Sequence, residues 1–344
     1  MRPNLSLAGV LCALLATTVP SQAETQYPEF VDQEIANAIK GGIRYLVRTQ
    51  NRDGSWRGSG SYGVYPTSMT ALAGMALLGS GSTPTRGQHW RSVRNAADFL
   101  VRSAQPSGLI TAMAEEGRSM YGHGFATMFL AEVYGMEEDA ARQRKLHDVL
   151  TKAVQLIVRA QSSYGGWYYT PDSSYDEGSV TVTQLQALRA CRNAGISVPV
   201  KAIKEAVAYI RKSANPDGGI AYSARNAGAS RPAITAAAVA VLYSAGRYDD
   251  PMADKAFEYS VRTLPVSGGG GGHHYYAHLY LSQACYQKGG EHWAKYYPKM
   301  SRWLLKQQRN DGSWQGDGVG TTYGTAIALT ILQLPWALVP IYQR

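Results

Sequence analysis

Cysteine is scarce in this sequence, which has three cysteines among 344 residues. Cys12 lies in an apolar N-terminal stretch, so only Cys191 and Cys285 remain for the rest of the chain. Both lie in predicted helices of non-adjacent repeats, which disfavours a disulfide between them even in an oxidising compartment. We therefore expect two buried free thiols.

Long apolar runs are missing after the N-terminal stretch, so no second segment reaches the roughly 20 residues that a membrane-spanning helix needs. The basic residues form no compact cluster, although the formal net charge is +9. This charge suits acidic polysaccharide, cell wall or anionic lipid as a partner, and nucleic acid is disfavoured for an exported protein. We expect a soluble protein without a transmembrane segment.

The first residues have the pattern of a secretory signal peptide. Arg2 supplies a short basic start, residues 5–19 are largely apolar, and Ser21-Gln22-Ala23 forms a small-residue cleavage site. A membrane anchor is the alternative, but the apolar stretch is too short for it. The sequence therefore predicts a signal peptide over 1–23, export to the periplasm or the cell exterior, and a single domain over 24–344.

A polar, glycine-containing loop recurs along the chain, each time after a predicted helix that ends near a basic residue. Weaker copies of this loop begin at Gln105, Ala214 and Gly268. Self-similarity at a period of roughly 50 residues predicts one supersecondary unit repeated six times. The clearest copies run from Gln50 to Trp56, from Gln161 to Trp167 and from Gln308 to Trp314.

Each repeat has the pattern of an outer helix, the loop and an inner helix. The outer helices are amphipathic, with Ile39, Ile43 and Leu46 at helical spacing in the first. The cation in their last turn complements the helix dipole and can bond the last carbonyls of its helix. The inner helices are small and apolar nearly all round, which indicates burial. They are predicted over 67–78, 122–134, 179–193, 232–244, 275–287 and 323–334.

These patterns predict an all-α protein, an α/α toroid of six helical hairpins with concentric inner and outer rings. An open solenoid of helix pairs is the alternative, and it normally needs polar capping repeats. The first and last repeats instead carry the strongest loop motifs, at Trp56 and Trp314. We therefore expect a closed ring in which the loops and the inner-helix N-termini open into a central cavity.

The glutamine-to-tryptophan loop resembles the repeat motif of the terpenoid cyclase and protein prenyltransferase superfamily. The resemblance covers nearly all of the chain after residue 23. In that superfamily the glutamine and tryptophan tie adjacent helices together, which implies a structural role for Trp56, Trp167 and Trp314. The resemblance also implies a cavity that binds hydrophobic ligands, including isoprenoids. A fold does not by itself assign a reaction.

The catalytic motifs of the superfamily are not intact here. Squalene-type cyclases protonate an alkene with an Asp-x-Asp-Asp motif, and the matching stretch, Asp176-Glu177-Gly178-Ser179, keeps only the first acid. Protein prenyltransferases hold zinc with Asp, Cys and His, but no Asp-x-Cys precedes His273 and His274. Alkene protonation and prenyl transfer are both disfavoured.

Aromatic and ionisable residues gather where the inner helices are predicted to begin, and such a concave ring is the default ligand site. Its positive helix ends favour anionic groups. His123, Asp176 and Glu177 are the candidates for acid–base chemistry. Alternatively, His123 has a structural role, either capping a helix or packing against its neighbours, and the two acids stabilise a helix dipole. The remaining candidate ligand-binding residues are Tyr65, Tyr121, Tyr175, Arg231, His273, His274, Tyr275, His278, Asp317 and Tyr323.

A metal site is one interpretation of His274 and His278, because an i, i+4 spacing places both imidazoles on one helix face. No glutamate follows in the zinc-protease pattern, and a third ligand would have to come from elsewhere in the chain. We therefore predict hydrogen-bonding roles for these histidines and no metal site. The sequence indicates no particular cofactor.

Three functions remain open from the sequence. The first is an exported toroid that binds a small hydrophobic ligand in its cavity. The second is a secreted polysaccharide lyase or hydrolase acting on a polymeric ligand, which the predicted export and the basic charge favour. The third is a non-catalytic interaction scaffold. We rank ligand binding first because the repeats resemble those of the cyclases, and we leave catalysis and the oligomeric state undecided.

Overall fold

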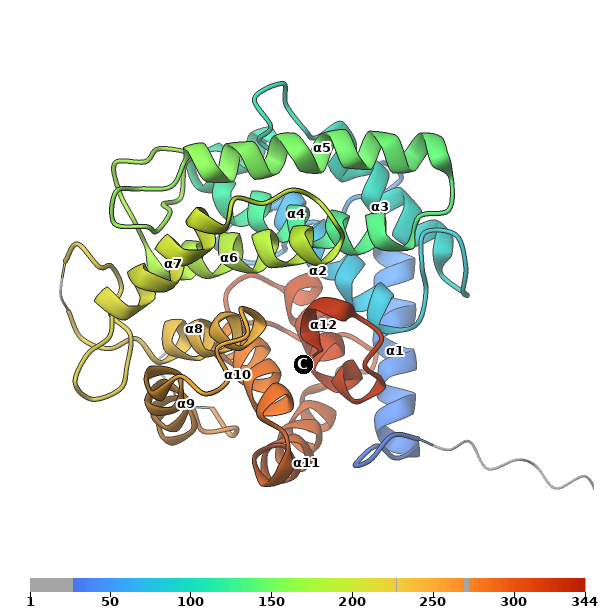
Figure 1. The fold of residues 1–344 in the computed structure, drawn as a ribbon. Coiled ribbons are helices and arrows are strands. Elements are labelled where there is room, and N and C mark those ends of the chain that lie inside the picture. Colours follow the sequence, from blue (N-terminus) through green and yellow to red (C-terminus); the bar gives the residue numbers. More distant parts are fainter. Residues whose placement is uncertain (1–26, 227, 269–271, 344) are drawn as a thin grey trace, which may run out of the picture.

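The computed structural model describes residues 27–226, 228–268 and 272–343, so the predicted signal peptide lies outside the described residues. Within them, twelve α-helices alternate between an outer and an inner ring (Figure 1). The outer helices are α1 (Gln33–Thr49), α3 (Trp90–Arg102), α5 (Ala140–Arg159), α7 (Val200–Lys212), α9 (Pro251–Thr263) and α11 (Gly290–Gln307). The inner helices are α2 (Pro66–Gly79), α4 (Ser119–Met136), α6 (Gly178–Asn193), α8 (Pro232–Ser244), α10 (His274–Lys288) and α12 (Thr321–Gln333).

The six inner helices form a closed ring. Each packs against the next in chain order, and α12 packs against α2, which closes the circle. The predicted all-α toroid of six hairpins is therefore confirmed, and the observed inner helices overlap all six predicted ranges. An open solenoid would leave α2 and α12 apart. No helix of the described residues is long and apolar enough to cross a bilayer.

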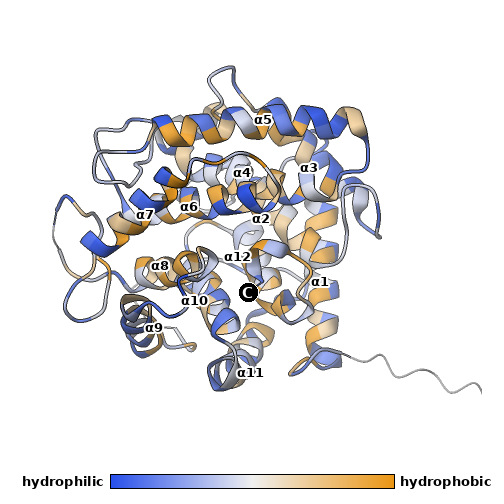
Figure 2. Ribbon diagram, viewed as in Figure 1, coloured by the Kyte–Doolittle hydropathy of each residue, from blue (hydrophilic) through white to orange (hydrophobic). Residues whose placement is uncertain are grey.

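Burial follows the two predicted hydrophobic patterns. All 14 residues of α2 are buried, as expected for an inner helix that contacts protein on every side. The outer helices are amphipathic, and Figure 2 shows hydrophilic and hydrophobic residues alternating around α5 and α7. Cys191 and Cys285 are both buried and free, which confirms the prediction for the two thiols.

The tryptophan of the repeat motif fastens each loop to its own hairpin. The indole N–H of Trp56 donates to the carbonyl oxygen of Leu46 at 2.9 Å, and that of Trp167 donates to Ile157 at 2.7 Å. The backbone N–H of Trp167 also donates to the hydroxyl of Thr181 on the inner helix, at 3.0 Å. These hydrogen bonds confirm the structural role that the resemblance implies for the tryptophans.

The glutamine of the motif joins neighbouring outer helices. The amide of Gln161 donates to Gly165 of its own loop at 2.8 Å and to Ala202 of α7 at 3.0 Å. Gln308 makes the same two bonds with Gly312 and with Ala38 of α1. Because Ala38 belongs to the first repeat, Gln308 closes the outer ring with the contact that Gln50 and Gln161 make within it.

The sequence predicts that the cations at the ends of the outer helices bond the last carbonyls of their own helix. The described residues show no such bond. The four arginines among them reach back to the loop of the preceding repeat instead. Arg102 donates to the carbonyl oxygen of Asp53 at 2.7 Å, and Arg159 donates to that of Ser107 at 2.9 Å. The extended arginine side chain is long enough to bridge two repeats, and the neighbouring loop offers an accessible carbonyl.

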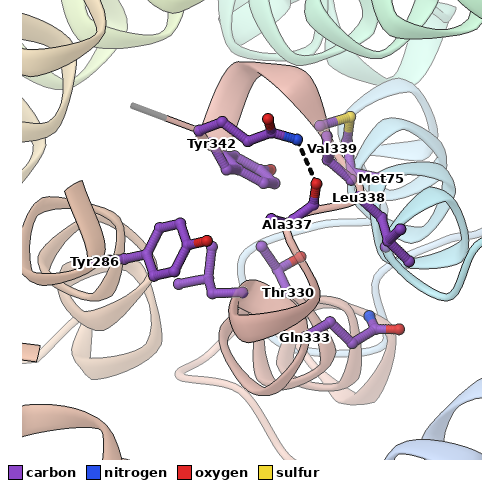
Figure 3. Close-up of a pocket in the computed structure, with 11 residues that line it drawn as sticks. Met75, Tyr286, Thr330, Gln333, Ala337, Leu338, Val339 and Tyr342 are labelled. Carbon is purple, nitrogen blue, oxygen red and sulfur yellow. Dashed lines mark hydrogen bonds between the residues drawn. The ribbon is translucent and has the colours of Figure 1, made fainter. Parts of the chain in front are cut away.

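The chain beyond α12 turns into the ring. It forms two short 3-10 helices, η2 (Leu334–Trp336) and η3 (Pro340–Tyr342), and η3 contacts α6. Ile341 and Tyr342 are buried. Figure 3 shows Tyr342 near Thr330 and Tyr286 around a cavity of about 10 Å³, which is room for about one water. This C-terminal segment, residues 334–343, closes the end of the ring where the inner helices finish.

Side chains also join two inner helices that are not neighbours in the ring. Gln186 of α6 donates to Gln283 of α10 at 2.8 Å. The Tyr276 hydroxyl of α10 donates to the carbonyl oxygen of Ser179 of α6 at 3.4 Å. These two helices are separated by α8 in the ring, so their direct contact lies across the space where the sequence predicts an open cavity. Protein atoms occupy much of that space.

Candidate functional site

The end of the toroid where the inner helices begin carries most of the exposed large apolar side chains. All six loops that join an outer helix to its inner helix lie at this end, which we call the entrance face. Of nine exposed large apolar side chains in the described residues, six belong to these loops, a concentration that marks an interaction site. They are Tyr62, Val64, Met113, Tyr164, Tyr175 and Tyr222.

Five tyrosines meet on this face around the start of α6, and we call them the tyrosine cluster: Tyr121, Tyr168, Tyr169, Tyr175 and Tyr222. The ring of Tyr168 lies 4.8 Å from that of Tyr169 and 5.4 Å from that of Tyr175, measured between centroids. The hydroxyls of Tyr169 and Tyr222 are 2.5 Å apart. Because Tyr175 and Tyr222 are 53% and 40% exposed, the cluster offers aromatic surface to a ligand.

Two arginines lie over the rings of this cluster. The guanidinium of Arg118 is 5.3 Å from the ring centroid of Tyr169, and that of Arg225 is 5.3 Å from the ring centroid of Tyr175. Neither arginine forms an ion pair among the described residues. The cluster therefore combines aromatic faces, hydroxyl groups and unpaired cations.

Glu177 lies beneath the cluster and caps α6. Its carboxylate accepts hydrogen bonds from the backbone N–H of Val180 at 2.8 Å and from the hydroxyl of Ser179 at 2.7 Å. The Ser179 hydroxyl is in turn hydrogen-bonded to that of Tyr121. Burial raises the pKa of Glu177, and its hydrogen bonds oppose that rise only in part. The Glu177 carboxyl is thus a weak, buried acid connected to the cluster through one serine.

Carboxylates cap two further inner helices at the same end. Glu115 accepts from the backbone N–H of Thr67 and of Ser68, at 3.2 and 3.1 Å, and so caps α2. Asp317 accepts from Tyr275 and Tyr276 at 3.2 and 3.4 Å, and so caps α10. With Glu177 on α6, three alternate inner helices receive a negative charge from the protein itself. These three helix ends do hold anionic groups, as the sequence predicts, but the groups are side chains of the protein and not parts of a ligand.

The other two candidates for acid–base chemistry are occupied inside the fold. Asp176 accepts from the hydroxyl of Ser223 at 2.6 Å and from the backbone N–H of Ala224 at 3.1 Å, so it holds the next loop in place. His123 is completely buried and its Nδ1 accepts from the backbone N–H of Ile110 at 3.1 Å. Burial lowers the pKa of His123 to about 4, so the imidazole is neutral at pH 7. Neither side chain belongs to the exposed surface.

His274 and His278 share one face of α10, as predicted, with ring centroids 4.3 Å apart. That face points away from the ring centre, towards the outer helix α11. The ring of His274 lies 4.5 Å from Trp303, and Nδ1 of His278 is hydrogen-bonded to the Tyr296 hydroxyl at 2.9 Å. Burial and the neighbouring His274 lower the pKa of His278 to about 3. The described residues contain no group of three potential ligands for a metal ion.

The remaining predicted residues lie at the rim of the entrance face or below it. Tyr65, His273 and Asp317 have positive φ angles of 34°, 56° and 38°, and non-glycine residues rarely adopt such angles. These strained positions begin or flank the inner helices α2, α10 and α12. Arg231 is exposed before α8. Tyr275 and Tyr323 are buried, so they support the rim without facing solvent.

Sequence reasoning placed Tyr121, Tyr175 and Glu177 correctly near the inner-helix starts but missed their main neighbours. Tyr168 and Tyr169 directly follow the motif tryptophan Trp167, and this pair of tyrosines was an available signal. Arg118 and Tyr222 come from two other loops, with no spacing rule to link them. The packing of successive repeats brings these loops together.

Comparisons with known proteins agree with this architecture. Residues 131–301 match the family of the squalene-hopene cyclase C-terminal domain. An alpha-onocerin synthase from Lycopodium clavatum is 37% identical over 82 residues, which are 24% of this chain. The match spans only 10% of that synthase, so it concerns a small part of a much longer protein.

Solved structures of two kinds share the fold. A type II terpene cyclase from Scytonema is similar with a TM-score of 0.59 and 15% identity, over 89% of this chain and 99% of that chain. An inactive variant of an α-1,6-mannanase from Salegentibacter sp., in complex with α-1,6-mannotetrose, is similar with a TM-score of 0.67 and 9% identity, over 90% of this chain and 100% of that chain. At such low identities these likenesses show the fold alone.

Proposed function

Because this chain belongs to the terpenoid cyclase superfamily, we propose that it is a binding protein that holds a hydrophobic, isoprenoid-like ligand against its entrance face. It does not start a cyclisation by protonating an alkene. The signal-peptide pattern over residues 1–23 supports a location outside the cytoplasm. The observation that carries the proposal is the partly exposed tyrosine cluster over the start of α6.

The stretch that matches the cyclase acid motif cannot supply a strong acid. A Cβ atom at Gly178 would lie 2.7 Å from Cγ2 of Ile234 on α8, so this position has no room for an acidic side chain. Ser179 follows, with a hydroxyl that donates to Glu177. Burial raises the pKa of Glu177 and makes it a poorer proton donor to an alkene. These features argue for binding without the cyclase reaction.

The location of the exposed aromatic surface favours binding on the face rather than deep in the ring. The contacts of α10 with α6 and the C-terminal segment occupy the interior, whereas Tyr175 and Tyr222 present their rings to solvent. A type II terpene cyclase from Scytonema has been solved with geranylgeranyl dihydroxybenzoate. An aromatic platform with Arg118 beside it would suit a prenyl chain that carries a polar head.

A carbohydrate ligand is the second candidate, and the hydroxyl pair of Tyr169 and Tyr222 favours it. Aromatic rings with polar edges, together with Arg118 and Arg225, also suit a sugar chain. Hydrolysis is less well supported, because glycosidases use two carboxyl groups on either side of the scissile bond. Glu115, Glu177 and Asp317 instead cap helices.

The test is calorimetric titration of the chain that begins at residue 24 with geranylgeraniol and, separately, with α-1,6-manno-oligosaccharide. We expect geranylgeraniol to bind and the double variant Tyr175→Ala/Tyr222→Ala to bind at least about tenfold more weakly, since each lost aromatic contact removes roughly 1 kcal/mol. Both side chains are exposed, so the variant should fold normally. Val261→Ala, which changes an exposed apolar residue of α9 outside the tyrosine cluster, is the matched control and should leave the affinity unchanged.

The two ligands separate the candidates. Binding of the oligosaccharide alone, weakened by the same double variant, would replace the isoprenoid proposal with the carbohydrate one. Geranylgeraniol binding that is equal in wild type and double variant would remove the entrance face as the site.

A further inference from the structure

A groove of about 390 Å³ lies at the opposite end of the toroid, where the inner helices finish. One wall is α1, another is the stretch after α2 that includes Ser82 and His89, and a third is the start of the C-terminal segment at Trp336 and Leu338. Its volume falls in the range of about 300–1,000 Å³ that is typical of small-molecule sites. None of the residues proposed for the entrance face lines it.

The floor of the groove is apolar. Ala36, Ile39 and Ile43 follow one another at helical spacing on α1, and Ile43 is buried while Ile39 is half-buried. Leu338 is exposed and Trp336 is half-buried on the facing wall. This surface can receive a linear hydrocarbon chain and exclude water from it.

The rim of the groove is basic and unpaired. Lys40 and Arg44 lie one turn apart on α1, both exposed, and no aspartate or glutamate is among the residues that line the groove. Neither cation has an ion-pair partner in the described residues. The acids at the start of the same helix are engaged elsewhere, since Asp32 and Glu34 both pair with Arg302 of α11. The two positive charges are therefore available to a ligand.

One buried polar atom also faces this space. Gln333 is 5% exposed, and its amide nitrogen donates to the carbonyl oxygens of Ala76 and Leu329, both at 3.0 Å. Its Oε1 has no hydrogen-bond partner, although the residue lines the groove. An unsatisfied buried acceptor costs roughly 1–3 kcal/mol, so a ligand hydroxyl that donates to it would be favoured.

We propose that this groove is a second ligand site, which binds a single-chain anionic amphiphile. The hydrocarbon chain lies along Ile39, Ile43 and Leu338, the phosphate or carboxylate group lies at Lys40 and Arg44, and a hydroxyl near the head group reaches Gln333. Charge complementarity selects an anionic over a cationic head, and the apolar floor selects a chain over a free anion.

The test uses lauroyl lysophosphatidic acid as a monomer below its critical micelle concentration, with calorimetry and tryptophan emission as readouts. We expect it to bind and to change the emission of Trp336, a change that Trp336→Phe removes. Dodecyltrimethylammonium and inorganic phosphate should each bind at least about tenfold more weakly, because each lacks one half of the recognition. The double variant Lys40→Gln/Arg44→Gln should weaken lysophosphatidic acid about tenfold or more, as expected for lost charge-assisted hydrogen bonds.

The matched control is Arg144→Gln/Lys145→Gln, which removes two exposed cations of α5 and should leave the affinity unchanged. Equal weakening by both double variants would reduce the effect to net charge and overturn the site. Binding only to vesicles containing phosphatidylglycerol, without a change in Trp336 emission, would indicate membrane-surface attachment and also overturn it. The same holds if monomer binds only after residues before Tyr27 are removed, because those residues would then be the occupant.

Discussion

At the scale of single residues, the loop glycines determine how closely the repeats approach one another. Gly54, Gly108 and Gly165 have φ angles of 91°, 94° and 96°, which favour glycine. A Cβ atom at these positions would lie 2.2, 2.3 and 2.3 Å from a backbone carbonyl oxygen of the following outer helix. Each glycine therefore has two requirements, a left-handed backbone and direct contact with neighbouring backbone.

Substitutions at Gly165 and Gly195 separate the cost of contact between repeats from the cost of the left-handed backbone. We expect Gly165→Ala to lower the free energy of unfolding by roughly 3 kcal/mol, because the methyl group collides with the carbonyl oxygen of Glu205 and the φ angle is unfavourable. Gly195→Ala is the control, since Gly195 has a φ of 84° with no atom within 4 Å of the added carbon. It should lose only about 1 kcal/mol. Urea unfolding of both variants measures the difference, and equal losses would show that contact between repeats contributes little.

At the scale of elements, the C-terminal segment and α4 meet around one buried acid. Glu132 of α4 is 5% exposed, and burial raises the pKa of its carboxyl to about 8, with the backbone N–H of Ile341 opposing the rise. Cys191 and Tyr342 lie near enough for this carboxyl to raise their pKa values further. A neutral Glu132 is compatible with the buried segment, whereas an ionised one is not.

This arrangement predicts a loss of stability at alkaline pH. The folded-state pKa of Glu132, about 8, is above the ordinary value of 4.5, so its contribution to stability is complete below pH 4.5 and disappears as the pH rises through 8. Between pH 6.5 and 8 the protein should lose about 2 kcal/mol of unfolding free energy by this route. Glu132→Gln should flatten the decline measured by urea unfolding in that window. His123 and His278 do not interfere there, because their lowered pKa values affect stability only below about pH 6.5.

At the scale of the whole molecule, the sequence predicted the ring better than the site. Repeat spacing and apolar periodicity are local patterns, and they located all six inner helices. The direction of a side chain within a predicted helix is not local: His274 and His278 share a face as expected, but that face meets Trp303 and Tyr296 of α11. The filled interior likewise depends on Tyr342, whose segment has no repeat pattern.

Ring closure predicts that the contact between the last and first repeats contributes as much stability as the same contact within the ring. Gln308 donates to Ala38 and Gly312 across the junction of the last and first repeats, and Gln161 donates to Ala202 and Gly165 within the ring. Each alanine variant loses two hydrogen bonds, so both should lower the unfolding free energy by about 2 kcal/mol.

The two sites are far apart, so the effects should add in the double variant Gln161→Ala/Gln308→Ala. If the ring opened at its junction in solution, Gln308 would have no partner on α1, and its substitution would then have a much smaller effect than that of Gln161. Hydrogen exchange of the α1 amides gives an independent measure: in a closed ring Gln308→Ala accelerates it, whereas Gln161→Ala accelerates exchange in α7 instead. Equal energetic losses with these two separate local responses are what a ring closed between its last and first repeats requires.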